Sequence, residues 1–270
     1  MPTFDIPAPG GLIHVVDLRE ERPEPSGAPP VVFVHGMVGH IGFWTPALAA
    51  SADRRRAVAL DLRGHGSSAT PHDGDYSIEA CAADVLSVMD ALGLAPVVLV
   101  GHSYGACVAT ELAAQHGDRV ERLVLVDPPG DFTALPQNVR DTEIVPFLAL
   151  LESDGWRAAV TAAWDGALEG STAATMATIR ARLADMPHAA MRSMYQSMMH
   201  FRAVGRLEQY LASPGTSVRG VLAPMNAWPF SLHNLMPGIK ASTVPDVGHW
   251  MMLDRPDAFV AALEDAISGA

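Results

Sequence analysis

The stretch Val97-Val98-Leu99-Val100-Gly101-His102-Ser103-Tyr104-Gly105 decides the fold. It begins with four apolar residues of high strand propensity, and a helical pattern starts directly after the serine. A G-x-S-x-G pattern between a strand and a helix predicts a sharp turn, with the serine hydroxyl exposed above a sheet. The two glycines fit this turn because they let neighbouring backbone pass without a Cβ clash. The stretch therefore predicts a strained, accessible Ser103.

Further apolar runs lie on both sides of this stretch. The runs are continuous rather than alternating, which is typical of strands buried on both faces in a parallel sheet. Segments with apolar residues at helical spacing separate the runs, such as the one that begins after a candidate N-cap at Ser77. The alternation predicts the α/β fold class. We expect strands at 12–18, 31–34, 57–62, 97–100, 123–126, 218–222 and 239–244.

One region departs from this alternation. From about 131 to 215 no strand pattern occurs, and helical patterns cover 139–151, 155–167, 172–184 and 187–199. We therefore predict a core formed by residues 1–130 and 216–270, with 131–215 as a helical cap. Open α/β sheets bind ligands at the carboxyl ends of their strands, so we expect the cap to lie there as a lid.

Composition narrows the class of partner. The chain has 270 residues, of which 49% are hydrophobic and 18% charged, as in globular proteins. Its net charge of −12 argues against nucleic acid, anionic membranes and polyanionic substrates as partners. No apolar stretch approaches 18 residues and no signal-peptide pattern is visible, so we expect a soluble cytoplasmic protein. The sequence leaves the oligomeric state open.

Taken together, these motifs resemble the α/β-hydrolase superfamily over almost the whole chain. His35-Gly36 after the strand 31–34 resembles the family's oxyanion loop, and residues 61–68 resemble its turn after the next strand. Gly248-His249-Trp250 resembles the loop of its catalytic histidine. The order of serine before histidine, with an acid between them, also matches the family. The resemblance implies a mostly parallel sheet with helices on both faces.

The chemistry of a serine hydrolase assigns the first roles. A serine hydroxyl is a weak nucleophile at neutral pH and needs an adjacent base. Among the 11 histidines, His249 is our candidate, because it alone lies in a loop after the last strand, where it reaches over the sheet edge toward Ser103. The tetrahedral intermediate carries an oxyanion that needs hydrogen-bond donors. We expect these to be the backbone N–H groups of Met37 and Tyr104.

The acid departs from the usual family pattern. Most members place an Asp just after the strand that corresponds to 218–222, but here 223–228 reads Ala-Pro-Met-Asn-Ala-Trp. No Asp or Glu occurs between Glu208 and Asp246. Some members, including certain haloalkane dehalogenases and lactone hydrolases, carry the acid after the preceding strand, the sixth of the family's sheet. Asp127 stands at that position and is our third triad residue.

Three alternatives for the acid stay open. Asp131 follows Asp127 closely, and Asp246 lies on the same loop as His249. Asn226 would orient the histidine as a neutral group, with less stabilisation of the imidazolium.

Substrate contacts are expected from the loops at the strand ends and from the cap. Aromatic and methionine side chains there favour an apolar pocket, because flexible thioethers adapt to varied ligands. The candidate substrate-binding residues are His35, Trp44, His102, Trp156, Trp164, Met194, Tyr195, Met198, Trp228 and Trp250.

We therefore predict a serine hydrolase that cleaves carboxylic esters or lactones with an apolar acyl group through an acyl-serine. The lactone preference comes from the resemblance alone. No cofactor is expected, and no metal either, because H-E-x-x-H and similar spacings are absent from the sequence. The small-molecule substrate is the one expected partner.

Other functions on the same fold stay open. One is a cofactor-independent dioxygenase that deprotonates an N-heteroaromatic substrate with a His/Asp pair. The others are a hydrolase of carbon–carbon bonds and a non-enzymatic small-molecule receptor.

Overall fold

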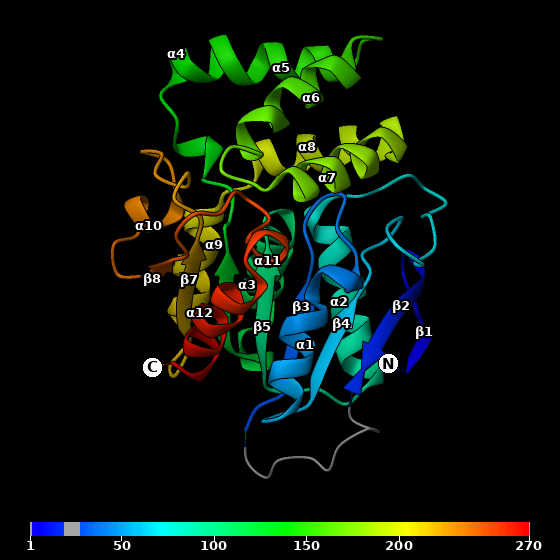
Figure 1. Cartoon of the computed structure of the whole chain (residues 1–270), viewed down its shortest axis with the longest axis vertical. Coiled ribbons are helices and arrows are strands. Elements are labelled where there is room, and N and C mark those ends of the chain that lie inside the picture. The colour runs from blue at the N-terminus through cyan, green and yellow to red at the C-terminus, as the bar shows by residue number, and fades with distance from the viewer. Residues whose placement is uncertain (1, 19–27, 270) are drawn as a thin grey trace.

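A computed structural model describes residues 2–18 and 28–269 of the chain. Its eight-stranded sheet has the order β1-β2-β4-β3-β5-β6-β7-β8, and the strands from β4 to β8 run parallel (Figure 1). The antiparallel pairs are β1 with β2 and β2 with β4. The strands are β1 (Thr3–Ala8), β2 (Gly11–Asp17), β3 (Val31–Val34), β4 (Ala57–Leu60), β5 (Val97–His102), β6 (Val120–Val126), β7 (Ser217–Leu222) and β8 (Lys240–Thr243).

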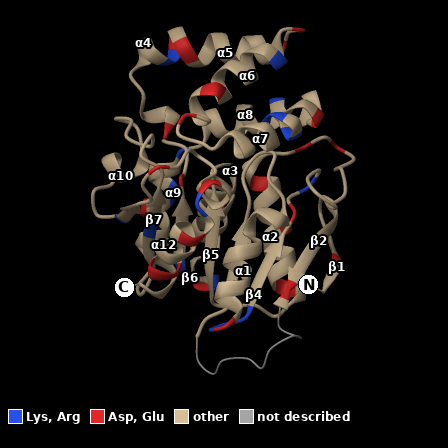
Figure 2. Ribbon diagram, viewed as in Figure 1, with Lys and Arg blue, Asp and Glu red and all other residues tan. Residues whose placement is uncertain are grey.

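The centre of the sheet forms the core of the molecule. Every residue of β3, β4 and β5 is buried. Their continuous valine and leucine runs explain this, since helices cover both faces of the sheet and no face of a central strand meets water. Figure 2 shows no charged residue on β3 or β5. The predicted α/β-hydrolase fold is therefore confirmed.

Two groups of helices cover the sheet. On one face α1 (Thr45–Ala52) packs against α12 (Pro256–Ser268), and on the other α3 (Tyr104–Gln115) packs against α2 (Ile78–Ala91) and α9 (Ala203–Leu211) (Figure 1). The hydroxyl of Ser77 accepts a hydrogen bond from the N–H of Ala80, so it caps α2 as expected.

The chain between β6 and β7 is helical. Residues 131–215 all belong to the part that the structure describes, and they contain no strand. All of these helices except the last, α9, lie above the edge of the sheet where β5 passes into α3 (Figure 1). Their action as a lid stays a prediction. The helices are α4 (Gln137–Val139), a π-helical turn (Arg140–Ile144), α5 (Val145–Leu151), α6 (Trp156–Ala167), α7 (Ala173–Asp185), α8 (His188–His200) and α9.

Strand β1 and helices α1, α9, α10 (Leu232–Leu235) and α11 (Met251–Asp254) were not expected from the sequence. Strand β1 is largely exposed and contains Pro7, which an edge strand tolerates because one side of its backbone needs no partner. Helix α9 is short, and it completes the layer over α3. The short helices α10 and α11 lie in the loops after β7 and β8.

The lengths and compositions of the helices bear on membrane insertion. Within residues 2–18 and 28–269, none combines the length and the apolar character that crossing a bilayer requires.

Candidate active site

Ser103 lies on a strained turn between β5 and α3. Its φ of 53° and ψ of −122° are rare for a residue with a side chain. The flanking glycines are sterically required: a Cβ on Gly101 would lie 2.3 Å from the carbonyl oxygen of Gly105, and one on Gly105 would lie 2.4 Å from that of His35. The close packing around the turn holds the strain in place.

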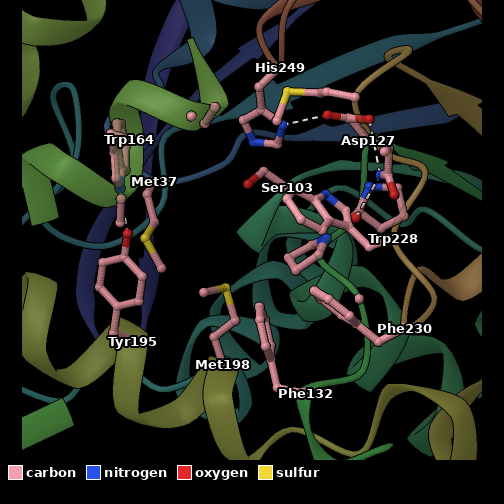
Figure 3. A pocket seen from close by; sticks show the side chains of 18 of the residues that line it. Met37, Ser103, Asp127, Phe132, Trp164, Tyr195, Met198, Trp228, Phe230 and His249 are labelled. Carbon is pink, nitrogen blue, oxygen red and sulfur yellow. Dashed lines mark hydrogen bonds and ion pairs between the residues drawn. The ribbon is translucent and has the colours of Figure 1, made fainter. Parts of the chain in front are cut away.

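His249 and Asp127 are joined by a hydrogen bond. The Asp127 Oδ2 lies 2.5 Å from His249 Nδ1, although the two residues are 122 positions apart. Because a carboxylate only accepts, Nδ1 carries the proton and Nε2 is left with a free lone pair. Figure 3 shows the Ser103 side chain beneath the His249 ring, and all three residues line one cavity.

The carboxylate of Asp127 is buried and held from a second side. Its Oδ1 accepts from the backbone N–H of Ala223 at 2.9 Å and from the side-chain amide of Asn226 at 3.0 Å. Asp127 itself has a φ of 41°, directly after β6. The end of β6 and the loop after β7 thus fix one oxygen, which leaves the other for His249.

The alternative acids point elsewhere. Asp131 accepts from the backbone N–H groups of Thr133 at 2.9 Å and Val204 at 3.0 Å. The Asp246 side chain is 85% exposed and pairs with Arg255. Asn226 contacts Asp127 instead of the histidine.

A buried turn at residues 35–39 packs against Ser103. A Cβ on Gly36 would lie 2.8 Å from that of Ser103. His35 holds the turn: its Nε2 accepts from the N–H of Leu62 at 3.0 Å, so its Nδ1–H donates to the Gly36 carbonyl at 2.8 Å. Burial lowers the pKa of His35 well below its usual value, so the ring is neutral.

Both predicted oxyanion donors border the nucleophile. Met37 belongs to the turn 35–39, and its side chain lines the cavity (Figure 3). Tyr104 is the first residue of α3, where a backbone N–H has no acceptor inside the helix. The Tyr104 side chain is buried, and its hydroxyl donates to the carbonyl of Tyr76 at 2.5 Å.

His102 supports the loop of His249 from below. Its Nε2–H donates to the His249 carbonyl at 3.0 Å, and the two rings lie 4.7 Å apart. Burial, and then the neighbouring His249, lower the pKa of His102 well below its usual value. His102 is therefore a neutral support, and it does not line the cavity.

The cavity has a volume of about 400 Å³ and a mostly apolar wall. Its lining includes no Lys or Arg among the described residues. Trp164 donates its indole N–H to the Tyr195 hydroxyl, which fixes both rings in the wall. Five of the ten predicted substrate-binding residues line the cavity: Trp164, Tyr195, Met198, Trp228 and Trp250.

The structure places the other five elsewhere. Trp44 is fully buried between Phe33 and Phe259 in the core, with ring centroids 5.1 and 6.1 Å away. Trp156 stacks on His188 within the helical region. The remaining three, His35, His102 and Met194, are buried outside the cavity lining.

Several lining residues were missed. Phe132 and Phe230 pack against each other at 5.4 Å, and both follow the carboxyl end of a strand. Their position after β6 and β7 was the available signal, because loops at that edge border the site. The others are Pro128, Pro129, Gly130, Ala163, Gly166, Ala167, Met199 and Met225. Asn226, expected only as an alternative partner of the histidine, also lines the cavity.

Within residues 2–18 and 28–269, no three or more His, Cys, Asp or Glu side chains are grouped so that they could hold a metal ion.

Comparison with known proteins gives consistent matches. Residues 29–219 match a family model described as alpha/beta hydrolase fold. The sn-1-specific diacylglycerol lipase ABHD11 of Mus musculus is 30% identical over 267 residues, which cover 87% of this chain and 80% of that protein.

Two solved structures illustrate the likeness of fold. Est816, described as an N-acyl homoserine lactone degrading enzyme, has a TM-score of 0.73 and 22% identity over 97% of this chain and 99% of its own. AqdC, described in ring cleavage of the Pseudomonas quinolone signal, has a TM-score of 0.79 and 21% identity over the whole of both chains. At these identities the two matches show a shared fold only.

Proposed function

Because the chain belongs to the alpha/beta hydrolase family and is an enzyme of that superfamily, we propose that it is a serine hydrolase of carboxylic esters or lactones. One observation carries the proposal. The hydrogen bond from His249 to Asp127 leaves Nε2 as the basic nitrogen, in the cavity that Ser103 lines.

In the proposed mechanism, the Ser103 Oγ attacks the carbonyl carbon of the substrate while His249 Nε2 takes its proton. Asp127 holds the ring in the required tautomer and stabilises the imidazolium. The carbonyl oxygen becomes an oxyanion, which accepts hydrogen bonds from the Met37 and Tyr104 amides. The C–O bond to the leaving group then breaks, His249 protonates the departing oxygen, and an acyl-serine remains.

Water completes the cycle. His249 removes a proton from a water molecule as its oxygen attacks the acyl carbon, and a second oxyanion forms in the same place. This intermediate releases the carboxylic acid, and the Ser103 oxygen regains its proton from His249. Every bond change is hydrolytic, so the reaction consumes only water.

The cavity wall supports an uncharged substrate with an apolar acyl part. Burying a charged group without a partner costs far more than burying an apolar one, and the described lining offers no cation to an anionic substrate. Trp164, Trp228 and Trp250 present apolar surface instead. The names of two related proteins, a diacylglycerol lipase and a lactone-degrading enzyme, are consistent with this substrate class.

The test uses p-nitrophenyl esters of increasing acyl length and a matching series of lactones. Ser103→Ala is expected to abolish hydrolysis, whereas Ser87→Ala is the control, because the Ser87 hydroxyl donates to its own helix. A fluorophosphonate probe is expected to label Ser103, as mapped by mass spectrometry. Labelling of a different serine would contradict the proposal, and a chelator is expected to leave the activity unchanged.

The dioxygenase alternative makes the opposite prediction for the same variant. A His/Asp base alone would suffice there, so Ser103→Ala would keep its activity and consume O₂ with an N-heteroaromatic substrate. A non-enzymatic receptor would bind esters without turnover above background.

A further inference from the structure

Arg182 reaches from the helical region to the turn beside Ser103. It lies near the end of α7, and its guanidinium donates through Nε to the Val38 carbonyl and through Nη2 to the Gly39 carbonyl at 3.0 Å. The guanidinium also lies 5.7 Å from the centroid of the Phe43 ring. One side chain thus contacts two consecutive peptide groups of a segment 143 residues away.

The segment that Arg182 holds is strained. Val38 has a φ of 55°, a conformation that a β-branched residue rarely adopts, and it is fully buried. Such a conformation persists only where several surrounding contacts fix it. On one side the Asp61 carboxylate accepts from the N–H of Ile41 at 2.7 Å. Arg182 supplies further contacts, to the carbonyls of Val38 and Gly39.

The same segment borders the reacting atoms. Gly36 is packed against Ser103, and the Gly36 carbonyl accepts from the N–H of Gly39 at 3.1 Å. Met37 is therefore enclosed in a tight turn whose far end is bound by Arg182. If the peptides at 38 and 39 rotate, the hydrogen bond from Gly39 to Gly36 weakens, and the Met37 amide loses its fixed direction.

We propose that Arg182 is a positioning residue that aims the Met37 amide at the oxyanion, so that α7 must be seated before the site is competent. This proposal rests on the proposed serine-hydrolase function and on Met37 as an oxyanion donor. A planar guanidinium fork suits the task because it binds two carbonyls in one fixed geometry. Arg182 itself touches no substrate; it acts through the turn.

The test compares Arg182→Gln and Arg182→Lys with Arg180→Gln. Arg180 lies on the same helix and pairs with Asp165 on the surface, which makes it a matched control. Displacing one oxyanion donor is expected to lower kcat roughly 10- to 100-fold, with KM changed by less than about twofold. Lysine keeps the charge and loses the fork, so Arg182→Lys is expected to fall between the wild type and Arg182→Gln.

A second readout separates positioning from general stability. A boronic acid inhibitor that mimics the tetrahedral intermediate is expected to bind the Arg182 variants more weakly, in proportion to their loss of kcat/KM. Affinity for the carboxylic acid product is expected to stay unchanged. A thermal unfolding curve shows whether each variant folds. If Arg182→Gln does not fold, the kcat and inhibitor affinity of the folded Arg182→Lys protein decide whether Arg182 has the positioning role.

The outcomes distinguish the two proposals. If the wild type hydrolyses esters and both Arg182 variants match Arg180→Gln in kcat, the positioning role is wrong and the serine-hydrolase function stands. A rise in KM with unchanged kcat would also overturn the positioning role. If the wild type neither hydrolyses esters nor reacts with the fluorophosphonate, the function itself fails.

Discussion

The side-chain amide of Asn226 donates to Asp127 Oδ1 and to the Pro128 carbonyl, each at 3.0 Å. Asn226 lies in the loop after β7. As noted for the sequence, most members of the superfamily that this chain resembles have the triad acid just after this strand. In this chain the carboxylate that is hydrogen-bonded to His249 follows β6, and the amide after β7 donates to it. The two loops thus divide between them the tasks of supplying the carboxylate and fixing its rotation.

Replacing Asn226 is expected to impair both activity and stability. In Asn226→Ala, Asp127 Oδ1 keeps only the hydrogen bond from the Ala223 N–H, and the Pro128 carbonyl loses its donor. A buried unsatisfied polar group is expected to lower the free energy of unfolding by about 1–3 kcal/mol. Urea unfolding and kcat on a chromogenic ester measure the two effects. Asn234→Ala is the control, because Asn234 is exposed and donates to the Trp228 carbonyl. Equal effects of the two variants would contradict the orienting role.

Asp127→Asn is expected to lower kcat by about 10⁴-fold, because an amide at this position favours the wrong histidine tautomer. Asp246→Asn tests the rival assignment. The Asp246 side chain is largely exposed and pairs with Arg255, so its substitution is expected to leave kcat within about twofold of the wild type. Steady-state kinetics decide between them, and a full loss in Asp246→Asn alone would refute the assignment of Asp127.

Stability is expected to fall as the pH drops below about 6.5. Burial lowers the pKa of both His35 and His102 well below its usual value, so each ring is neutral in the folded state. The unfolded chain binds a proton at each ring below about pH 6.5, so acid favours unfolding by roughly 1.4 kcal/mol per pH unit for each histidine. Above that range neither state binds the proton, and this contribution levels off.

Urea unfolding between about pH 5 and pH 7 checks this slope. His102→Gln keeps a donor for the His249 carbonyl and is expected to make the slope shallower. His72→Gln is the matched control, because the His72 side chain is exposed to solvent in the folded chain. An unchanged slope in His102→Gln would show that His102 does not contribute.

Trp228→Ala is expected to raise KM for esters with long acyl groups about tenfold, because the acyl chain loses one apolar contact surface. The Trp228 side chain is 53% exposed and lines the cavity, so it lies where the cavity opens to solvent. Its removal is expected to change the midpoint of thermal unfolding little. Trp156→Ala serves as the comparison, because Trp156 stacks on His188 away from the cavity. A KM that stays constant across acyl lengths would argue against contact with the substrate.

Much of the fold could be predicted because its central strands are buried on both faces. Continuous apolar runs such as Val31–Val34 have one consistent explanation in an α/β chain, and the glycines around Ser103 mark a turn that few other contexts need. The exposed β1 lacks such a signal, since its side chains alternate weakly and include a proline.

The site could be predicted only where the chemistry requires a particular residue type. Ser103 and His249 were identified by chemical need and by position along the chain, and Asp127 by the resemblance to superfamily members that carry their acid at this position. The structure brings all three into one cavity. The type of an apolar residue does not show whether it packs in the core or lines the cavity. Trp44 and Trp228 both follow strands, yet Trp44 packs in the core and Trp228 lines the cavity. Arg182 gave no signal, because its partners are backbone carbonyls.

The absence of Lys and Arg from the described lining of the cavity also bears on how a turnover ends. Under the proposed chemistry a neutral ester enters, and a carboxylic acid forms that ionises at neutral pH. The new anion finds no lysine or arginine in the described lining, and it lies near the carboxylate of Asp127. Water solvates it far better than this wall does. Hydrolysis would therefore convert a ligand that the cavity retains into one that it expels, so product inhibition is expected to be weak.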